Sequence, residues 1–586
     1  MRVTPLLLLI ALAPVSVPAW AVRVGDVQIT GVGEAMSENV RVSLSLTDAV
    51  GREVSERRLD YLLRAAEDEA REALEPFGHY TPHVTVTPTR QGEDVTVRID
   101  IAPGPPVRVR AATVAIEGEG GRDRYLREEL DAFRPHIGEV LDHGTYEASK
   151  VRITRRLAER GYFDADFLAR RVEVTRAEQA ADIDLRWTSG ARYDMGATVF
   201  AQTPRPVVRE ALLQQLVYWE EGSYYHQGKL DRLRESLARL DYFGRIDIEP
   251  HPERAVDHRV PVTVTLTPAR RDVYTVGLSY GTDSGAGVRL GLERRYVNDR
   301  GHKALAQLDW AQRRKTATLQ YRIPALAWLD GWYTLSLQGA DEQTDYIDTR
   351  RLELVASRSG QITRRWTATA SVHALRERWQ LQPQSPDAAP EEHRYASFTF
   401  PSLRGEYVKA DDRMFARDGF ALVGTLRGGL EGIGSDADFA QAHLSARWYR
   451  GVGERSRLIA RGELGRTFTD TLVDMPPSLR YYAGGDLSIR GYGWREVGPR
   501  YGDYALGARN VVTASLQYEH YLDNGWGGAV FVDSGDAFDD RPNWRTGIGV
   551  GVRWRSPVGL VRVDIARGLD DADSPFTLHL NIGPDL

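Results

Sequence analysis

Cysteine is absent from all 586 residues of the chain. Disulfide bonds and thiolate metal sites are therefore excluded, and the cellular compartment has to be inferred from another feature. Long apolar runs are also missing after the N-terminal segment. No later segment approaches the roughly 18 apolar residues that a membrane-spanning helix needs. An excess of positive charge is lacking as well. The formal net charge is -6, so nothing in the composition indicates a nucleic-acid partner.

Recognisable signatures of catalysis or cofactor binding are also missing. The chain has no G-x-S-x-G nucleophile elbow, no H-E-x-x-H zinc motif and no phosphate-binding loop. Its 13 histidines are scattered without the spacing of metal ligands, and we interpret His520 and His579 as surface or aromatic-girdle residues. We therefore expect a protein that is not an enzyme and that uses no metal and no other cofactor.

The N-terminus has the form of a secretory signal peptide. Residues 1–21, MRVTPLLLLIALAPVSVPAWA, contain one arginine, an apolar run from Leu6 to Leu12 and a final small-x-small triplet. This pattern predicts an exported protein cleaved after Ala21, because two prolines interrupt a run that is already too short to anchor the chain. An exported chain without a spanning helix can still cross a membrane as a closed β-barrel.

From residue 22 to about residue 268 the sequence repeats a pattern of roughly 80 residues. Each unit opens with a β-rich segment, continues through helical patterns, turns at an aromatic-glycine landmark such as GYFDADF, and ends in two alternating strands. The order β-α-α-β-β predicts small mixed sheets packed against helices, which is an α+β fold. Three unrelated α+β domains are the alternative. The predicted units are residues 22–103, 104–189 and 190–268.

The second half of the chain changes from the helical period to a period of two. In GLVRVDIARG the apolar side chains of Val561, Val563 and Ile565 share one face, and the charged side chains of Arg562 and Asp564 share the other. Burying such charges unpaired in a soluble sandwich is costly. A barrel with lipid outside and water inside accommodates them.

About sixteen segments of this kind follow one another between residues 269 and 586. The first lies near 273–281, the eleventh near 455–467 and the last near 576–583. Tyr and Trp recur at the segment ends, which is typical of an aromatic girdle at a membrane interface. The fold prediction is therefore three α+β repeats followed by an all-β transmembrane barrel of about 16 antiparallel strands.

A connection of roughly 40 residues, 468–509, separates the eleventh segment from the twelfth. Loops this long are usually functional or disordered. This one contains PPSLRYYAGGDLSIRGYGWREVGP, whose prolines, aromatic pairs and glycines are typical of a compact loop folded on itself. Within it, Arg490 stands between an isoleucine and a glycine.

These motifs resemble a known family. The repeats resemble POTRA domains, and Ile489-Arg490-Gly491-Tyr492 is similar to the VRGY/F motif in the sixth extracellular loop of the BamA/TamA superfamily. The longer run around the motif is most similar to the TamA (translocation and assembly module) branch, which three repeats also fit. The resemblance implies a barrel in the outer membrane of a Gram-negative cell, POTRA domains in the periplasm, and a loop 468–509 that folds back into the barrel.

An arginine carried into a water-filled lumen needs an acidic partner. Two candidates lie on the inward faces of the next two strands, Glu519 in ASLQYEHYL and Asp533 in AVFVDSGDAF, and Phe531 shares the face of Asp533. The resemblance implies the same pairing, although both carboxylates could simply solvate the lumen. As a solvent-exposed pair they are expected to contribute about 0.2–1 kcal/mol, with about 0.5–1 kcal/mol from a cation–π contact to Phe531.

The first and last barrel strands are predicted to meet at a weak lateral seam. Glycine weakens a strand interior, and Pro584 cannot donate to a ladder, so pairing beyond Ile582 should be poor. An open seam would expose backbone groups that template another strand. Simple lumen packing explains the glycines of the first strand equally well. The predicted seam residues are Gly277, Gly281, Leu578, Leu580, Ile582 and Gly583.

Three functions from different classes remain open. The first is an outer-membrane assembly factor, or insertase, that inserts autotransporter-type proteins through the seam. The resemblance implies its partners: unfolded outer-membrane clients, outer-membrane lipid, and an inner-membrane-anchored TamB-like protein bound by the POTRA domains. The second is a pore of the two-partner-secretion type that exports one dedicated substrate, which three repeats disfavour. The third is a barrel enzyme, which needs a nucleophile–base constellation that the sequence does not show.

Overall fold

The computed structural model describes residues 21–281, 285–326, 329–343, 347–363, 365–382, 392–501, 504–556, 559–570, 576–583 and 585. The predicted signal peptide, apart from Ala21, and Pro584 lie outside these ranges. The chain divides into two compact units. One holds the first two repeats and part of the third, and the other holds the rest of the third repeat together with a long antiparallel sheet. In the described ranges no helix is both long and apolar enough to cross a bilayer.

The first repeat has the predicted order with one added strand. Its helix α2 begins where the Ser55 hydroxyl accepts a hydrogen bond from the Arg58 N–H, and it buries a stripe of leucines and alanines against the sheet. The added strand β2 extends the sheet to the order β2-β1-β4-β3, in which β1 and β4 are parallel. The elements are β1 (Ala21–Thr30), α1 (Glu34–Ser43), β2 (Glu53–Ser55), α2 (Glu56–Glu72), β3 (His83–Gln91) and β4 (Asp94–Ala102).

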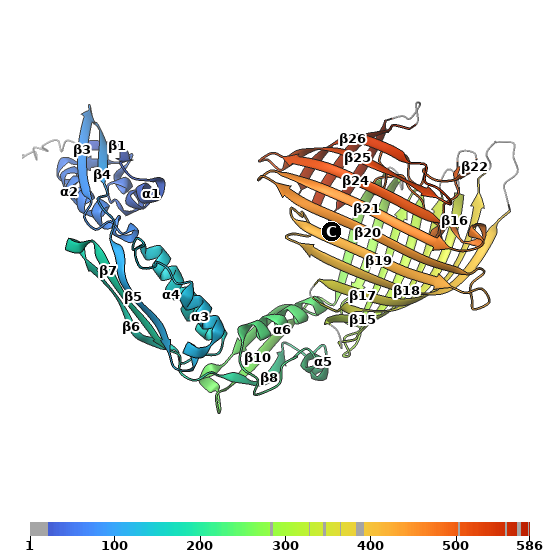
Figure 1. The fold of residues 1–586 in the computed structure, drawn as a ribbon, viewed down its shortest axis with the longest axis horizontal. Coiled ribbons are helices and arrows are strands. Elements are labelled where there is room, and N and C mark those ends of the chain that lie inside the picture. Colours follow the sequence, from blue (N-terminus) through green and yellow to red (C-terminus); the bar gives the residue numbers. More distant parts are fainter. Residues whose placement is uncertain are drawn as a thin grey trace, which may run out of the picture. The chain divides into compact units, whose positions relative to one another are not determined.

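The second and third repeats each pack two helices on a three-stranded sheet, with strand orders β5-β7-β6 and β8-β10-β9. The order β-α-α-β-β is therefore confirmed in all three repeats (Figure 1). The second repeat contains β5 (Arg108–Glu117), α3 (Arg124–Asp131), α4 (His143–Glu159), β6 (Asp166–Thr175) and β7 (Ala180–Thr188). The third contains β8 (Asp194–Gln202), α5 (Glu210–Gln214), α6 (Gln227–Leu240), β9 (Phe243–Pro250) and β10 (Arg259–Pro268).

The end of the third repeat contacts the turn between the second and third barrel strands. The buried Tyr242 hydroxyl donates a hydrogen bond to the Gly301 carbonyl, and Arg209 pairs with Asp299 at 2.5 Å. Burial raises the pKa of Tyr242, so this hydroxyl stays protonated and remains a donor. The part of the third repeat that belongs to the second unit is thus fixed to the barrel by polar contacts as well as by the chain itself.

The predicted sixteen strands form one antiparallel sheet that curls into a barrel (Figure 1). The observed first, eleventh and last strands agree with the predicted positions within one residue at each end. The strands are β11 (Asp272–Gly281), β12 (Gly285–Arg294), β13 (Lys303–Ala311), β14 (Arg314–Pro324), β15 (Leu329–Gln343), β16 (Ile347–Gln361), β17 (Trp366–Leu381), β18 (Arg394–Ala410), β19 (Gly419–Gly429), β20 (Phe439–Val452), β21 (Ser456–Phe468), β24 (Asn510–Tyr521), β25 (Trp526–Phe538), β26 (Arg545–Ser556), β27 (Gly559–Gly568) and β28 (Thr577–Gly583).

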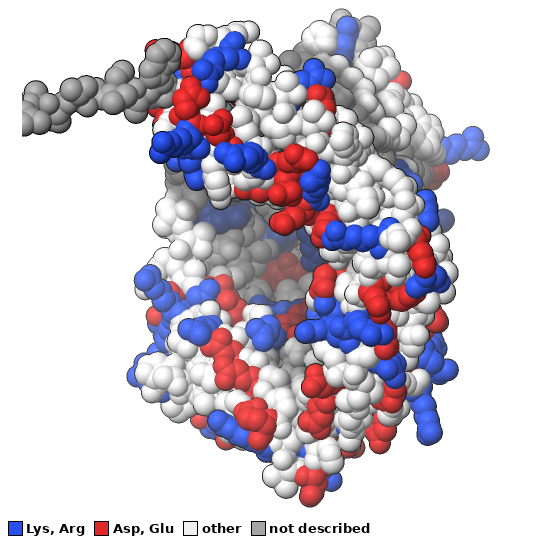
Figure 2. Space-filling view, turned by 90° about the vertical axis from the view of Figure 1, so that its left-hand side faces the viewer, with Lys and Arg blue, Asp and Glu red and all other residues white. Residues whose placement is uncertain are grey.

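The alternation along each strand separates an apolar exterior from a polar interior. On β25, Val530 and Val532 are exposed outside, whereas Phe531 and Asp533 between them are buried inside. Aromatic rings lie at strand ends on the outside, where Trp526 stacks on another tryptophan at a centroid distance of 5.5 Å. On the face shown in Figure 2, charges of both signs are interspersed and no extended single-sign patch forms.

The sheet order runs from β11 to β28, and in the described residues no ladder joins these two strands to each other. β28 has only seven residues and pairs with β27 from Thr577 to Gly583. Pairing therefore extends one residue beyond the predicted limit at Ile582. Leu578 and Ile582 are exposed on the outer face, and Gly277 pairs with Arg289 of β12.

Candidate functional site

The connection between β21 and β24 folds back into the barrel and brings Arg490 to the inner face of β25. The guanidinium group donates from Nε to Asp533 Oδ2 at 2.7 Å and from Nη2 to Oδ1 at 2.9 Å. The backbone N–H of Arg490 also donates to Oδ2 at 3.1 Å. Its Cζ lies 3.3 Å from the centre of the Phe531 ring. Arg490, Phe531 and Asp533, which the sequence nominated together, are therefore in direct contact.

Three further residues complete what we call the Arg490 site, and none of them was nominated from the sequence. Arg490 Nη1 donates to Gln517 Oε1 at 2.8 Å and to Asp564 Oδ2 at 3.0 Å, and Nη2 lies 3.5 Å from the Ser515 hydroxyl. The alternation of the strands put all three on lumen faces, but it could not show which of them reach the loop. One arginine is shared between two carboxylates on β25 and β27.

The burial of this site contradicts the expectation of a solvent-exposed pair. The side chain of Arg490 is 4% exposed and that of Asp533 is 0% exposed, because the loop itself fills this part of the lumen and excludes water. Removing one partner of a buried pair costs about 3–5 kcal/mol, since a charge is left without compensation. The pair therefore contributes more to the position of the loop than the estimate for an exposed pair allowed.

Glu519 has a different partner from the one predicted. Its buried carboxylate accepts a hydrogen bond from Arg457 Nε at 2.7 Å and from Arg553 Nε at 2.6 Å. The link to Arg490 is indirect and passes through Gln517, whose amide donates to Glu519 Oε1 at 2.7 Å. The direct pairing of Glu519 with Arg490 is therefore wrong. The strand register places Glu519 nearer the end of the barrel at which β24 finishes, out of reach of the loop.

Glycines on the inner face of β26 make room for the loop. A Cβ at Gly547 would lie 1.8 Å from the Arg490 carbonyl oxygen, and one at Gly549 would lie 2.4 Å from the Phe531 ring. Within the motif, Gly491 has a φ of 95°, and a Cβ there would lie 2.6 Å from the backbone of Arg567. The first two glycines of the run GIGVGV, residues 547–552, are thus explained by the close approach of the loop backbone and of the Phe531 ring.

The other motif residues pack the loop against the barrel wall. Ile489 is fully buried in a cluster with Tyr481, Val497 and other loop and strand residues. The Tyr492 hydroxyl donates to Asp570 Oδ2 at 3.2 Å and lies against Gly568, where a Cβ would come within 2.6 Å of the ring. Every residue of the motif therefore has a packing or hydrogen-bonding role in docking the loop.

The loop also holds the last strand. His579 of β28 is 4% exposed and accepts a hydrogen bond at Nε2 from the Gly491 N–H at 3.1 Å, while its Nδ1 contacts the Asp486 carboxylate of the loop. The interpretation of His579 as a surface or girdle residue is therefore wrong. Only the folded loop shows what His579 contacts. His579 thus holds the last strand to the loop, while no ladder joins the described residues of β28 to those of β11.

This arrangement positions elements by hydrogen bonds and ion pairs. In the described residues no group of three or more His, Asp or Glu side chains could hold a metal ion. The carboxylates of Asp533 and Asp564 accept hydrogen bonds from Arg490, which fixes the loop to β25 and β27, and the hydrogen bond from Gly491 to His579 fixes it to β28. The site can hold the wall of the barrel next to the seam in one conformation.

Three family models match the sequence. The Omp85 superfamily domain matches residues 297–585, the first POTRA domain of TamA matches 26–103, and the POTRA model described as a surface antigen variable number repeat matches 109–187. The chain is also 24% identical over 369 residues to the outer membrane protein assembly factor BamA of Nitratidesulfovibrio vulgaris. That match covers 60% of this chain and 46% of the relative, so the chain spans about half of the relative's length.

Two solved structures are similar to this chain. BamA from Haemophilus ducreyi lacking POTRA domains 1–3 has a TM-score of 0.65 at 14% identity, over 81% of this chain and 98% of that one. CdiB from Acinetobacter baumannii has a TM-score of 0.47 at 13% identity, over 94% of this chain and 100% of that one. The first of these likenesses shows that the fold is shared.

Proposed function

The chain belongs to the Omp85 superfamily, with TamA-type POTRA domains ahead of an outer-membrane barrel, and from this we propose that it is an insertase for autotransporter-type proteins. Its barrel lies in the outer membrane and its POTRA domains lie in the periplasm. We propose that it helps translocate clients and inserts them through the lateral seam between β11 and β28. No covalent chemistry is required of the protein.

The observation that carries this proposal is that no ladder joins β11 to β28 in the part of the chain that the structure describes. An edge strand presents free N–H and C=O groups that can pair with a strand of another chain. β28 is seven residues long, and its buried His579 accepts a hydrogen bond from the loop. A client strand can therefore add to β11 while β28 remains bound inside the barrel.

The Arg490 site has a defined part in this mechanism. If the seam opens, the strands on one side of it have to stay in place while the strand on the other side pairs with the client. The loop ties β25, β26 and β27 together and holds β28 through His579, so it stabilises the C-terminal wall. The N-terminal edge, β11, is then the side at which clients add.

The experiment uses the absence of cysteine, because every introduced pair is the only pair present. Cysteines are placed across the seam, scanning residues 276–280 of β11 against residues 577–581 of β28. Each variant is reconstituted into vesicles, and insertion of a urea-unfolded autotransporter barrel is measured with the pair reduced and then oxidised. We expect insertion to fall only on oxidation, because the disulfide keeps the seam closed.

A matched pair controls for the disulfide itself. Leu444 and Leu464 are register partners on β20 and β21, and both are exposed on the outer face away from the seam. Crosslinking them should leave insertion unchanged. If insertion continues with a verified disulfide across the seam, the seam is not the route and the proposal is wrong.

We also propose that the POTRA domains bind a TamB-like protein that is anchored in the inner membrane, by adding one of its strands to an exposed sheet edge. Edges β3 and β6 differ in one relevant respect, since β3 contains Pro88, which has no N–H to donate, and β6 contains no proline. β6 is thus the better edge for pairing with an added strand.

Photo-crosslinking from Arg171 on β6 should capture the TamB-like protein, and crosslinking from Thr87 on β3 should not. The reverse result would move the contact to β3.

A further inference from the structure

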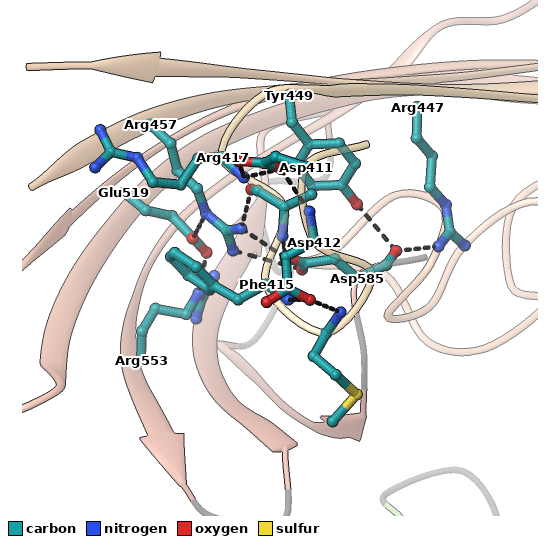
Figure 3. Close-up of polar contacts among 12 residues, drawn as sticks. Asp411, Asp412, Phe415, Arg417, Arg447, Tyr449, Arg457, Glu519, Arg553 and Asp585 are labelled. Atoms are coloured by element: carbon teal, nitrogen blue, oxygen red, sulfur yellow. Dashed lines mark hydrogen bonds and ion pairs between the residues drawn. The ribbon is translucent and has the colours of Figure 1, made fainter. Parts of the chain in front are cut away.

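Asp585 follows the last barrel strand and is buried inside the lumen, with 3% of its surface exposed. Its carboxylate accepts hydrogen bonds from two arginines, Arg457 Nη1 at 2.5 Å and Arg562 Nη2 at 2.5 Å. The backbone N–H of Ala416 donates to the same carboxylate at 3.0 Å. Figure 3 shows Asp585 enclosed by side chains from several strands and from one turn. Three donor groups therefore surround this carboxylate, which is how proteins bind the carboxylate of a ligand.

The backbone of Asp585 is recognised as well as its side chain. Its carbonyl oxygen accepts a hydrogen bond from Arg447 Nη1 at 2.8 Å and from the Tyr449 hydroxyl at 3.0 Å. Both donors lie on β20, across the lumen from β28. The donors therefore match a carboxylate and a nearby carbonyl, which is what an extended peptide segment with an acidic group presents. We call these five donors the Asp585 pocket.

One wall of the pocket is a turn that is ordered by its own contacts. In the turn between β18 and β19, the Asp411 carboxylate accepts hydrogen bonds from the N–H groups of Arg417 and Asp418. Phe415 presents its ring to the Arg457 guanidinium at 4.0 Å, and the Ala416 carbonyl accepts from Arg457 at 2.6 Å (Figure 3). The turn and Arg457 hold each other through contacts that do not involve Asp585.

Without the Asp585 carboxylate, the pocket would contain more positive than negative charge. Arg457 also pairs with Glu519, whereas Arg562 donates in addition to the neutral amide oxygen of Asn581 at 2.8 Å. Arg447 donates only to the carbonyl of Asp585 among the described contacts. A cavity of about 270 Å³, lined by Arg447, Arg562 and Asp585 among others, adjoins the pocket. The site is therefore built for an anion and has room beside it.

The pocket lies at the end of the barrel where a client arrives. β11 begins directly after the third repeat, and the even-numbered turns of the sheet return to that same end. The turn 411–418, the start of β21 and the end of β28 are all at this periplasmic end. An acidic segment that enters the lumen from the periplasm meets the pocket at the mouth.

We propose that the Asp585 pocket is a binding site for a carboxylate on an extended peptide, and that Asp585 is its displaceable internal ligand. The occupant in function is an acidic segment of a client strand, which is the part of the inference that rests on the proposed insertase function. Displacing Asp585 frees the end of β28 from β20, β21 and the turn. Client capture therefore frees the end of β28 near Asp585, while the contact of His579 with the loop still holds the rest of the strand.

The test measures peptide binding and not insertion. A negative result therefore contradicts the proposed pocket without contradicting the proposed insertase function. The protein is the full chain in detergent, as wild type and as Asp585→Asn, which cannot accept the same three hydrogen bonds. The probe is a fluorescent peptide with the sequence of residues 581–586, NIGPDL, and binding is read by anisotropy. We expect the Asp585→Asn chain to bind the peptide about tenfold or more tightly than wild type, because the pocket is vacated.

The peptide carries two carboxylates, one on the aspartate side chain and one at its C-terminus, and peptide variants show which of them binds. NIGPDL with a C-terminal amide offers only the aspartate side chain, NIGPNL with a free terminus offers only the terminal carboxylate, and amidated NIGPNL offers neither. Binding of either acid, but not of the neutral peptide, supports the proposal and names the source. Equal binding of the neutral peptide, or equal affinity for the wild-type and Asp585→Asn chains, overturns it.

Two further variants keep the test decisive. Arg562→Gln, combined with Asp585→Asn, should lower the affinity for the acidic peptide about tenfold or more, since a charged hydrogen bond is lost. Asp523→Asn removes an exposed carboxylate from a turn at the same end and should change nothing. Should Asp585→Asn fail to form a compact barrel resistant to detergent, Asp585→Glu keeps the charge while misplacing it. An affinity above wild type then supports the proposal, and an unchanged affinity overturns it.

Discussion

The guanidinium of Arg490 and the carboxylate of Asp533 form two parallel hydrogen bonds of 2.7 and 2.9 Å inside the barrel, with both side chains almost completely buried. The two residues belong to different parts of the chain, a loop and the strand β25. Because bidentate pairing fixes both distance and orientation, the loop can dock in only one position. The predictions below follow from this and related contacts.

Replacing Arg490 with alanine should release the loop. The change removes the bidentate partner of Asp533 and one of the two arginines that pair with Asp564, which costs about 3–5 kcal/mol. We expect faster cleavage between residues 469 and 509 by an added protease and a lower unfolding temperature of the barrel. Limited proteolysis followed by mass spectrometry locates the cuts.

Arg500 supplies the control for this change, since it lies in the same loop. Its side chain is 45% exposed and pairs only with Glu496 nearby, so Arg500→Ala should cost no more than about 1 kcal/mol. Equal protection of the loop in the wild-type and Arg490→Ala proteins would show that the pair does not determine the docked position.

Gly547 on β26 should not tolerate a methyl group. A Cβ there would lie 1.8 Å from the Arg490 carbonyl oxygen, so Gly547→Ala should displace the loop at a cost of about 1–3 kcal/mol. The matched change is Gly339→Ala on β15, where a Cβ meets nothing within 4 Å. Thermal unfolding and proteolysis of both variants test this. Equal stability of the two would mean that the loop backbone does not approach β26 as described.

Glu519→Gln should separate the stability of the barrel from the docking of the loop. Arg457 and Arg553 lose their shared carboxylate, which lowers the free energy of unfolding by about 3–5 kcal/mol. The loop should stay protected, because Asp533 and Asp564 still hold Arg490. Glu454→Gln in an exposed turn is the control. A loop as sensitive as that of Arg490→Ala would restore a role for Glu519 in holding Arg490 through Gln517.

The repeats, the strand number and the lumen face of each strand could be predicted because each depends on a local period. A strand alternates with a period of two whatever its neighbours are, so Asp533, Gln517 and Asp564 were placed on inward faces correctly. Which inward residues meet depends on the register between strands and on where the loop descends. Neither the register nor the path of the loop can be predicted from a local pattern. For this reason Glu519 was assigned the wrong partner.

The burial of the Arg490 pair and the role of Asp585 could not be predicted for a related reason. An alternating strand with charges on one face indicates a polar lumen, but it does not indicate whether water or protein fills that lumen. Asp585 lies beyond the last period, after Gly583 and Pro584, where no repeating pattern constrains its place. Its partners come from β20, β21, β27 and a turn, so only the folded sheet brings them together.

Tyr242 offers a last test, at the joint between the third repeat and the barrel. Its hydroxyl is buried and donates to the Gly301 carbonyl, so Tyr242→Phe should leave that acceptor without its donor and cost about 1–3 kcal/mol. The ring keeps its packing, and the repeat itself should remain folded. We expect hydrogen exchange to rise in the turn 298–302 and at the start of β9, with little change in β1 to β7. Unchanged exchange in the turn would show that this hydrogen bond does not hold the joint, and would leave the pair formed by Arg209 and Asp299 as the contact to test next.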